Sequence, residues 1–389
     1  QEIYALDGSD KAEHPYSVSE RNYEIQLLQS LGKNRHAVFF TRDRETIDYH
    51  YERSFILDPT DPEPDPKKKR KIFDPRVTHA MTLEVDEFGN VLKSVAIAYS
   101  RRSPAYLEQS KTLITYTENR VTNKPIELDW YRIGVPIETR TYEITGLNST
   151  SLFTLDFIRT QLSIASEIPY EAIATTGVQK RAIEHIRTLY RQDSEANSTD
   201  PTPLPLGDIH SLALPCESFK LAFTNGLLNE VYSSKITSIE LNALLSNEGK
   251  YVQQDGGWWI PSGRQAFDAD RFYLPVQIKD PFGNLYLSTY DSHKLLVIRT
   301  EDPLNNTVQI RNDYRVLQPK EITDPNRNRS QAAFDALGMV VGTAIMGKGT
   351  ETLGDSFANF NADLTDNEIK AFFEADNPLS LAIQHLGTA

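Results

Sequence analysis

The stretch "DPFGNLYLSTYDSHKLLVIRTEDPLNNTVQIRNDYRVLQPKEITDPNRNRSQAAFDALGM", residues 280–339, carries an aspartate at every eleventh position. The odd members of this series begin DPFGN, DPLNN and DPNRN, and the even members lie in YDSHKL, NDYRVL and FDALGM. Runs of strand-forming residues such as LYLSTY, LLVIRT and TVQI separate the aspartates. The pattern predicts 22-residue repeats of two antiparallel strands and two turns, over residues 251–347.

The aspartates are expected to open the turns, because an aspartate at the first turn position accepts hydrogen bonds from following amides. Gly283 and Asn305 suit the left-handed position that ends many hairpin turns, and Arg327 fits the equivalent place less well. Each turn carries a single carboxylate, which favours a structural role over calcium binding. The predicted repeat-turn residues are Asp280, Gly283, Asp291, Asp302, Asp313, Asp324, Asp335 and Gly338.

The first 150 residues are also typical of strands. Apolar residues alternate on both sides of a turn over 86–90, and that turn repeats the pattern of DPFGN. We therefore expect residues 1–150 and the repeats to belong to one sheet system. The sequence PKKKRK, residues 66–71, lies in a predicted exposed loop over 59–75. It is similar to a nuclear import signal or an anion-binding patch, but a solvated loop is the favoured interpretation.

The remaining segments are predicted to be mixed or helical. Residues 151–250 are predicted to contain helices near 176–192 and 237–247, each opened by a capping-box pattern, and a loop rich in Pro, Ser and Thr over 194–207. Residues 348–389 are predicted to form a helical tail. The chain begins with Gln1 and shows no basic-then-apolar leader, so we expect it to be a piece of a longer protein whose tail is truncated.

Composition excludes several classes of function. The net charge of −13 argues against binding to nucleic acid or to anionic membranes. The single cysteine excludes an internal disulfide framework, and no run of 18 apolar residues predicts insertion into a bilayer.

Motifs for catalysis are weak. The segment GTAIMGKGT, residues 342–350, is similar to a phosphate loop but has Gly349 where Ser or Thr should hold magnesium. The eight histidines show no metal-ligand spacing, and Cys216 has apolar neighbours that indicate a buried thiol. Trp258 and Trp259 are interpreted as anchors in a sheet rather than as a sugar platform. We therefore predict no catalytic residue, no metal and no cofactor.

The repeat units resemble RHS (YD) repeats. Longer strings extend a resemblance to the TcdB middle region of the B component of bacterial insecticidal toxin (Tc) complexes over nearly the whole chain. These strings are YALDGSDKAEHPYSVSERNY (4–23), EVDEFGNVLKSVAIAYSRR (84–102), ALPCESFKLAFTNGLL (213–228), GGWWIPSGR (256–264) and the run over 312–349.

The resemblance implies a fold, a function and partners. It implies a mainly β, antiparallel segment of a hollow sheet shell, or cocoon, with a few inserted helices. In such complexes the B and C components together enclose a cytotoxic segment from the C component, and the pentameric A component is the translocation channel. The chain is expected to be a non-catalytic part of this shell in a secreted complex, with the C component and, through other parts, the A component as partners.

Two alternatives to the shell segment remain open at this point. The chain could instead be a YD-repeat surface adhesin that binds glycans through Trp258 and Trp259, or a glycosidase that uses turn carboxylates such as Asp302 and Asp324. The last alternative requires that substitution of these aspartates abolish turnover without loss of stability.

Overall fold

The computed structural model describes residues 1–5, 7–9, 11–52, 55–147, 149, 151–351, 353–358, 360–378 and 381. The chain divides into two compact units. Unit 1 comprises residues 1–193 and 203–262, and unit 2 comprises residues 194–202 and 263–389. Each unit is built on one large, almost wholly antiparallel sheet, so the predicted mainly β fold is confirmed.

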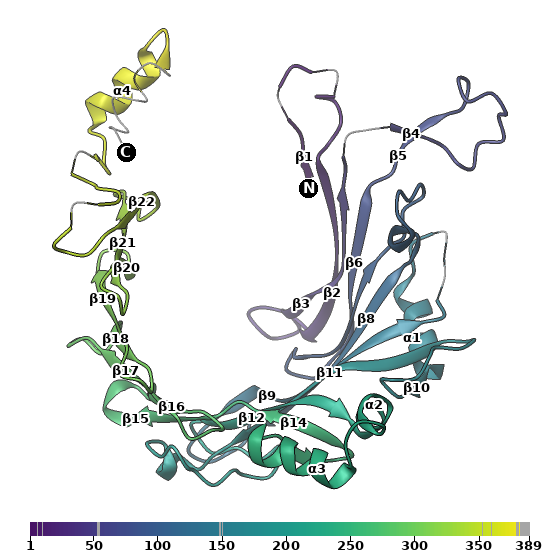
Figure 1. Cartoon of the computed structure of the whole chain (residues 1–389). Helices are drawn as coiled ribbons and strands as arrows, with labels where there is room; N and C mark the ends of the chain where they lie inside the picture. The colour runs from purple at the N-terminus through teal and green to yellow at the C-terminus, as the bar shows by residue number, and fades with distance from the viewer. Residues whose placement is uncertain are drawn as a thin grey trace. The chain divides into compact units, whose positions relative to one another are not determined.

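Unit 1 contains a 12-stranded sheet in the order β1-β2-β3-β6-β7-β8-β9-β11-β12-β14-β13, and β10 adds to it by parallel pairing with β11 (Figure 1). Strands β4 and β5 form a separate hairpin. The strands are β1 (Glu2–Ile3), β2 (Ser17–Gln29), β3 (Val38–His50), β4 (Phe55–Leu57), β5 (Lys71–Phe73), β6 (Arg76–Val85), β7 (Val91–Ala98), β8 (Leu113–Lys124), β9 (Arg132–Thr145), β10 (Ser166–Ile168), β11 (Gln179–Tyr190), β12 (Pro215–Thr224), β13 (Val252–Gln254) and β14 (Gly257–Pro261).

The helices of unit 1 are short and begin at side-chain caps. Thr154 accepts a hydrogen bond from the Phe157 amide at the start of α1, and Thr237 forms the predicted capping box with Glu240 at the start of α3. The helical segments of unit 1 are η1 (Leu107–Ser110), α1 (Leu155–Ile164), α2 (Asn225–Tyr232), α3 (Ser238–Ala243) and the π-helical turn η3 (Leu244–Glu248), and the 3-10 turn η2 (Asp193–Glu195) spans the boundary between the two units in the chain.

Helix α1 covers one face of the central strands and forms the main core. Ile158 of this helix is fully buried, and Leu155 packs into the same cluster. Burial of such side chains stabilises the unit by about 1.5–3 kcal/mol each. The other members of the cluster are Met81, Leu83, Val95, Ile97, Ile114, Tyr116, Tyr142, Ile144, Leu147 and Phe153. Two smaller clusters lie around Tyr190 and around Trp258.

Unit 2 contains an eight-stranded sheet in strict chain order, so every connection is a hairpin (Figure 1). Its strands are β15 (Arg264–Asp268), β16 (Leu274–Lys279), β17 (Leu285–Tyr290), β18 (Val297–Glu301), β19 (Thr307–Asp313), β20 (Gln318–Thr323), β21 (Arg329–Phe334) and β22 (Val340–Met346). The 3-10 turn η4 (Ala269–Arg271) joins β15 to β16, and α4 (Asp366–Glu374) follows β22.

The two faces of this sheet differ in chemistry. Paired residues of antiparallel strands share a face, so the register assigns each side chain to one side. One face, here called the apolar face, carries no charge at its paired positions Ile278, Tyr286, Ser288, Thr300, Val308, Ile310, Ile322, Ser330 and Ile345. The opposite face, here called the polar face, carries the charged and amide residues Gln277, Lys279, Arg299, Glu301, Gln309, Arg311, Glu321, Arg329 and Gln331, together with Leu285, Leu287, Ala344 and Met346.

The apolar face remains accessible. Tyr286 is 41% exposed, Ile322 is 39% exposed and Ile345 is 72% exposed. On the polar face, Arg311 donates a 3.3 Å hydrogen bond to Glu321 across β19 and β20. The middle of unit 2 is therefore a single-layer wall with one wet face and one apolar face.

The prediction of a helix near 176–192 is wrong, because residues 179–190 form strand β11. Gly177 has a φ of +90°, which breaks a helix at the expected cap, and the side chain of Gln179 accepts from the Thr175 amide. Helices α1 and α2 were not predicted. The helix near 237–247 and a helix in the tail are present as α3 with η3 and as α4, where Thr365 and Glu368 form the predicted capping box.

The expectation of one sheet system is also wrong. The turn at Asp86 joins β6 to β7 in unit 1, whereas the turn at Asp280 joins β16 to β17 in the separate sheet of unit 2. Similar turn sequences thus recur in two sheets. Among the described helices, none combines the length and apolar character of a bilayer span.

Candidate functional site

The predicted turn aspartates all lie at connections between strands of unit 2. In the odd series, Asp280, Asp302 and Asp324 each accept the backbone N–H four residues later through Oδ1. Their Oδ2 atoms accept from the amide group of the asparagine at that same position, at 2.8–2.9 Å. The carboxylate thus closes the turn against its own backbone.

The even series uses the same oxygen with more varied partners. Oδ1 of Asp335 accepts from the amides of Leu337 and Met339, and Oδ1 of Asp313 accepts from the Arg315 amide. Asp291 is buried, and it accepts from the Leu295 amide and from the Tyr314 hydroxyl at 2.6 Å. Asp291 therefore connects two successive turns of the even series.

Each of the six turns contains a left-handed residue. Gly283 has a φ of +89° and Gly338 a φ of +83°, but Asn305 at +64° and Arg327 at +70° carry side chains in the same conformation. Lys294 and Leu317 complete the set at +57° and +55°. Arg327 occupies the position where the sequence indicated a poorer fit, and the turn retains its geometry at the expense of local backbone strain.

The hydrogen bonds within the turns favour the ionised form of Asp302 and Asp324. Hydrogen bonds from Asn306 lower the pKa of Asp302, and those from Asn328 lower the pKa of Asp324. Among the described residues, no three His, Cys, Asp and Glu side chains lie close enough together to hold a metal ion. The carboxylate oxygens of Asp302 and Asp324 accept hydrogen bonds from groups within their own turns. This arrangement suits a structural carboxylate rather than a general acid.

The predicted loop over 59–75 is a hairpin extension with internal order. Arg70 forms an ion pair with the buried Asp58, and the Arg70 amide donates to Asp61 at 2.7 Å. The Thr60 hydroxyl and the Arg70 guanidinium lower the pKa of Asp58 to about 2. Lys67 and Lys68 are exposed, and their backbone amides donate to Asp65. The basic residues thus lie on a structured hairpin.

The other singled-out residues are not poised for catalysis. Cys216 is buried, and residues 342–346 of the phosphate-loop lookalike lie in strand β22. Trp258 is 3% exposed and Trp259 1% exposed, so neither ring presents an open face to a sugar.

The most concentrated polar cluster in unit 1 was not predicted. It lies on β8, β9 and β11, where the pairing places Glu138 directly between Arg120 and Arg187. In the next row, Arg140 lies between Glu118 and His185. Because side chains two residues apart share a face, both rows lie on the face that carries Tyr116 and Tyr142 of the core.

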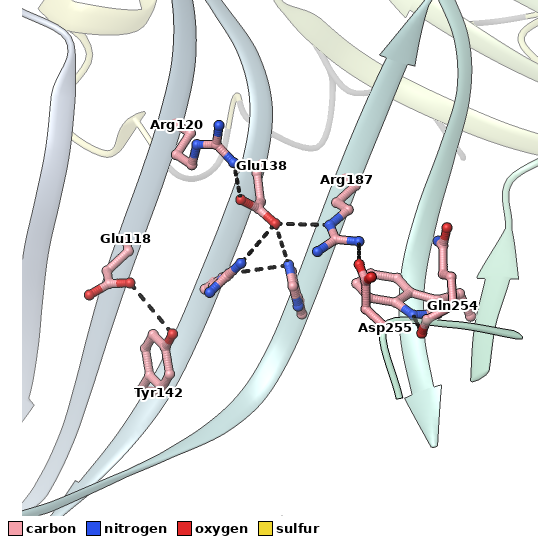
Figure 2. A network of polar contacts seen from close by, with 10 residues as sticks. Glu118, Arg120, Glu138, Tyr142, Arg187, Gln254 and Asp255 are labelled. Atoms are coloured by element: carbon pink, nitrogen blue, oxygen red, sulfur yellow. Dashed lines mark hydrogen bonds and ion pairs between the residues drawn. The ribbon is translucent and has the colours of Figure 1, made fainter. Parts of the chain in front are cut away.

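Glu138 is the centre of this cluster, as Figure 2 shows. Its carboxylate is 1% exposed and lies 2.8 Å from Arg120, 2.9 Å from Arg187 and 3.2 Å from Arg140. His185 Nε2 lies 2.7 Å from Oε1 of Glu138. A β-bulge between Ala182 and Glu184 brings the odd-numbered His185 and Arg187 to the face on which Ala182 lies.

The cluster extends to the hairpin of β13 and β14. The Arg187 guanidinium lies 4.7 Å from the centre of the Trp259 ring and also pairs with Asp255. The Trp259 indole donates to the Gln254 carbonyl at 3.0 Å. Trp259 therefore anchors the hairpin against the buried charges.

The electrostatics favour a fixed structural cluster. Burial acts to raise the pKa of Glu138, but hydrogen bonds from His185 and three arginines outweigh it and hold that pKa well below 4.5. Burial lowers the pKa of His185 despite its hydrogen bond to Glu138. A carboxylate saturated by donors is a poor general base or nucleophile, so the arrangement clamps strands together.

Sequence reasoning missed this cluster for an identifiable reason. On the predicted helix, His185 and Arg187 project from different faces. In a strand, residues two apart lie on the same face. The spacing of two between His185 and Arg187, and between Glu138 and Arg140, therefore places each pair on one face of its strand.

Comparison with known proteins supports the resemblance inferred from the sequence. Residues 1–63 and 67–134 match the family model described as the insecticide toxin TcdB middle/C-terminal region. No curated protein matches the chain significantly in sequence.

Several solved Tc toxin structures share the fold. The crystal structure of TcdB2-TccC3 matches with a TM-score of 0.57 and 22% identity, over 96% of this chain and 18% of that chain. The crystal structure of TcdB2-TccC3-Cdc42 matches with a TM-score of 0.56 and 22% identity, over 96% of this chain and 17% of that chain. A Photorhabdus luminescens Tc holotoxin pore matches with a TM-score of 0.55 and 22% identity, over 96% of this chain and 17% of that chain. The predicted likeness to the middle region of a Tc B component is confirmed, whereas the assignment of the repeats to the RHS/YD class remains a prediction.

The left-handed turn positions give a matched test. Replacing Arg327 with glycine removes the strain at φ +70° and is expected to raise the free energy of unfolding of unit 2 by about 0.5–1 kcal/mol. Gly283→Ala, at φ +89° and with no atom within 4 Å of the added methyl group, is expected to lower it by about 1 kcal/mol. Urea unfolding measures both, and equal effects of the two substitutions would contradict the turn assignment.

The Glu138 cluster gives a second test. Glu138→Gln removes the buried carboxylate that pairs with the largely buried Arg187 and with the more exposed Arg120 and Arg140, and it is expected to destabilise unit 1 by about 3 kcal/mol at pH 7. Since the pKa of Glu138 is depressed in the folded state, its contribution is complete above 4.5 and is lost at lower pH. The difference in the free energy of unfolding between the wild type and Glu138→Gln should therefore become smaller at acidic pH.

The control for this substitution is Glu143→Gln on the same strand. The Glu143 side chain is 43% exposed and lies 3.9 Å from Arg181, so the change should stay below about 0.5 kcal/mol. Chemical denaturation of both variants between pH 3 and pH 7 supplies the comparison. A Glu138→Gln effect as small as that of the control would refute the clamp.

Proposed function

We propose that this chain is a non-catalytic wall segment of a Tc toxin B component. In this proposal it forms part of the hollow sheet shell that encloses a cytotoxic segment for delivery through the A-component channel. The observation that carries the proposal is the single-layer sheet of unit 2, with a charged face and an uncharged apolar face. Such a sheet separates two environments with few residues.

The matched structures support the proposed partners. They contain TcdB2 with TccC3, and one is a Tc holotoxin pore. The C component is therefore the proposed direct partner, and the A component is proposed to act through other parts of the B component. The complex is proposed to be secreted.

We assign the apolar face to the enclosed space. An unfolded cargo exposes apolar side chains, and contact with residues such as Ile322 and Tyr286 removes them from water. The polar face, with the Arg311–Glu321 pair, is suited to bulk solvent.

The chemistry of the turns supports a role without catalysis. The carboxylates of Asp302 and Asp324, which a glycosidase would need, each accept hydrogen bonds within their own turn. A general acid needs a raised pKa, whereas both of these pKa values are lowered.

Protection of cargo from protease tests the proposal. Ile322→Lys places a charge on the apolar face at a side chain that is 39% exposed, and Gln309→Lys places the same charge on the polar face. In a B component carrying this chain and co-expressed with its C component, Ile322→Lys is expected to reduce the protected cargo several-fold, and Gln309→Lys to leave it unchanged.

Circular dichroism and urea unfolding confirm that both variants fold. Full protection in Ile322→Lys, or loss of protection in Gln309→Lys alone, would overturn the assignment of the faces. Cargo that stays protected when the segment is deleted would overturn the shell function itself.

A further inference from the structure

We propose that unit 1 carries a binding site for a neutral carbohydrate, in a cavity between helices α2 and α3 and the β13–β14 hairpin. The cavity has a volume of about 450 Å³, which lies in the range of small-molecule sites. It is separate from the turn residues and from the Glu138 cluster, and the proposed shell function does not use it.

The wall of this cavity carries carboxamides from three elements. Asn225 and Asn229 come from α2, Asn242 from α3 and Gln253 from β13. Each carboxamide offers two donors and an acceptor oxygen. Within the described part of the chain, none of these four side chains makes a hydrogen bond, so their capacity is available to a ligand.

The lining favours a neutral ligand over a charged one. It contains no Asp, Glu, Lys, Arg or His side chain. At the start of α3, Thr237 accepts the Glu240 amide and Glu240 accepts the Thr237 amide. An anion would find no countercharge among the lining side chains.

An apolar floor completes the site. Leu228, Leu241 and Trp258 contribute to the lining, and they belong to one packed cluster. Trp258 is 3% exposed, so it contributes little open surface to the cavity.

This combination matches the amphipathic surface of a sugar. A pyranose ring has an apolar C–H face that can pack on aliphatic side chains such as Leu228 and Leu241, and hydroxyl groups around its edge that pair with carboxamides. An extended peptide would instead seek a free strand edge for backbone pairing, and β13 contributes to the cavity only through Gln253. The carbohydrate is therefore the occupant that the lining favours.

The test is saturation-transfer difference NMR on the full 389-residue chain. The probes are the methyl glycosides of glucose, galactose, mannose and N-acetylglucosamine, with glucuronate and a capped neutral dipeptide as comparators. We expect saturation transfer to at least one neutral glycoside and none to glucuronate. Binding of the dipeptide or glucuronate alone, or of no probe at 20 mM (a concentration on the order of weak single-sugar dissociation constants), overturns the proposal.

Variants locate the site. Asn229→Ala with Asn242→Ala removes two carboxamides from exposed helix positions and is expected to weaken binding at least about tenfold, since each lost hydrogen bond weakens it severalfold. Asn247→Ala in η3 is the matched control, because Asn247 is exposed and does not line the cavity. Retained binding in the double variant with an unchanged unfolding midpoint, or an equal loss in the control, also overturns the proposal.

Discussion

Backbone hydrogen bonding between neighbouring strands is the constraint on which unit 2 depends. A single-layer sheet buries little apolar area, so the ladder of N–H and C=O groups must remain complete from β15 to β22. Each turn interrupts that ladder, because the backbone amides within a turn have no neighbouring strand to donate to. The turn aspartates resolve the problem by accepting those amides with their own carboxylates. Repetition of one turn every eleven residues then propagates the sheet without a thick core.

Unit 1 solves the same problem differently. Its central strands carry a helix on one face, and the core around Ile158 and Tyr142 supplies apolar burial. Where that core ends along β8 and β9, the face continues as the Glu138 cluster. A buried carboxylate with several donors adds less stability than an apolar side chain of equal size, but it resists any shift of strand register. The clamp therefore fixes three strands and the β13–β14 hairpin relative to one another.

The parts of this fold that were predicted from sequence are those governed by local chemistry. Asp-Pro and Gly at fixed offsets specify turns within five residues, and the Thr-to-Glu capping boxes of α3 and α4 specify helix starts. Strand β11 was misassigned because its β-bulge breaks the alternation of two that marks a strand. The Glu138 cluster joins residues 49 positions apart, so only the strand register brings Arg187 to Glu138. The turns at Asp86 and Asp280 have similar sequences but lie in different sheets, so their sequences could not predict the boundary between the two sheets.

The two faces of unit 2 are proposed to meet different environments in the assembled complex. Thiol labelling measures this directly, because Cys216 is buried and does not report. Cysteine introduced at Ser330 lies on the apolar face, and cysteine introduced at Gln309 lies on the polar face; both positions are exposed in the chain alone. After assembly with the C component, a bulky maleimide should modify position 309 and leave position 330 unreacted. Equal labelling of both positions, or protection of position 309 alone, would contradict the account.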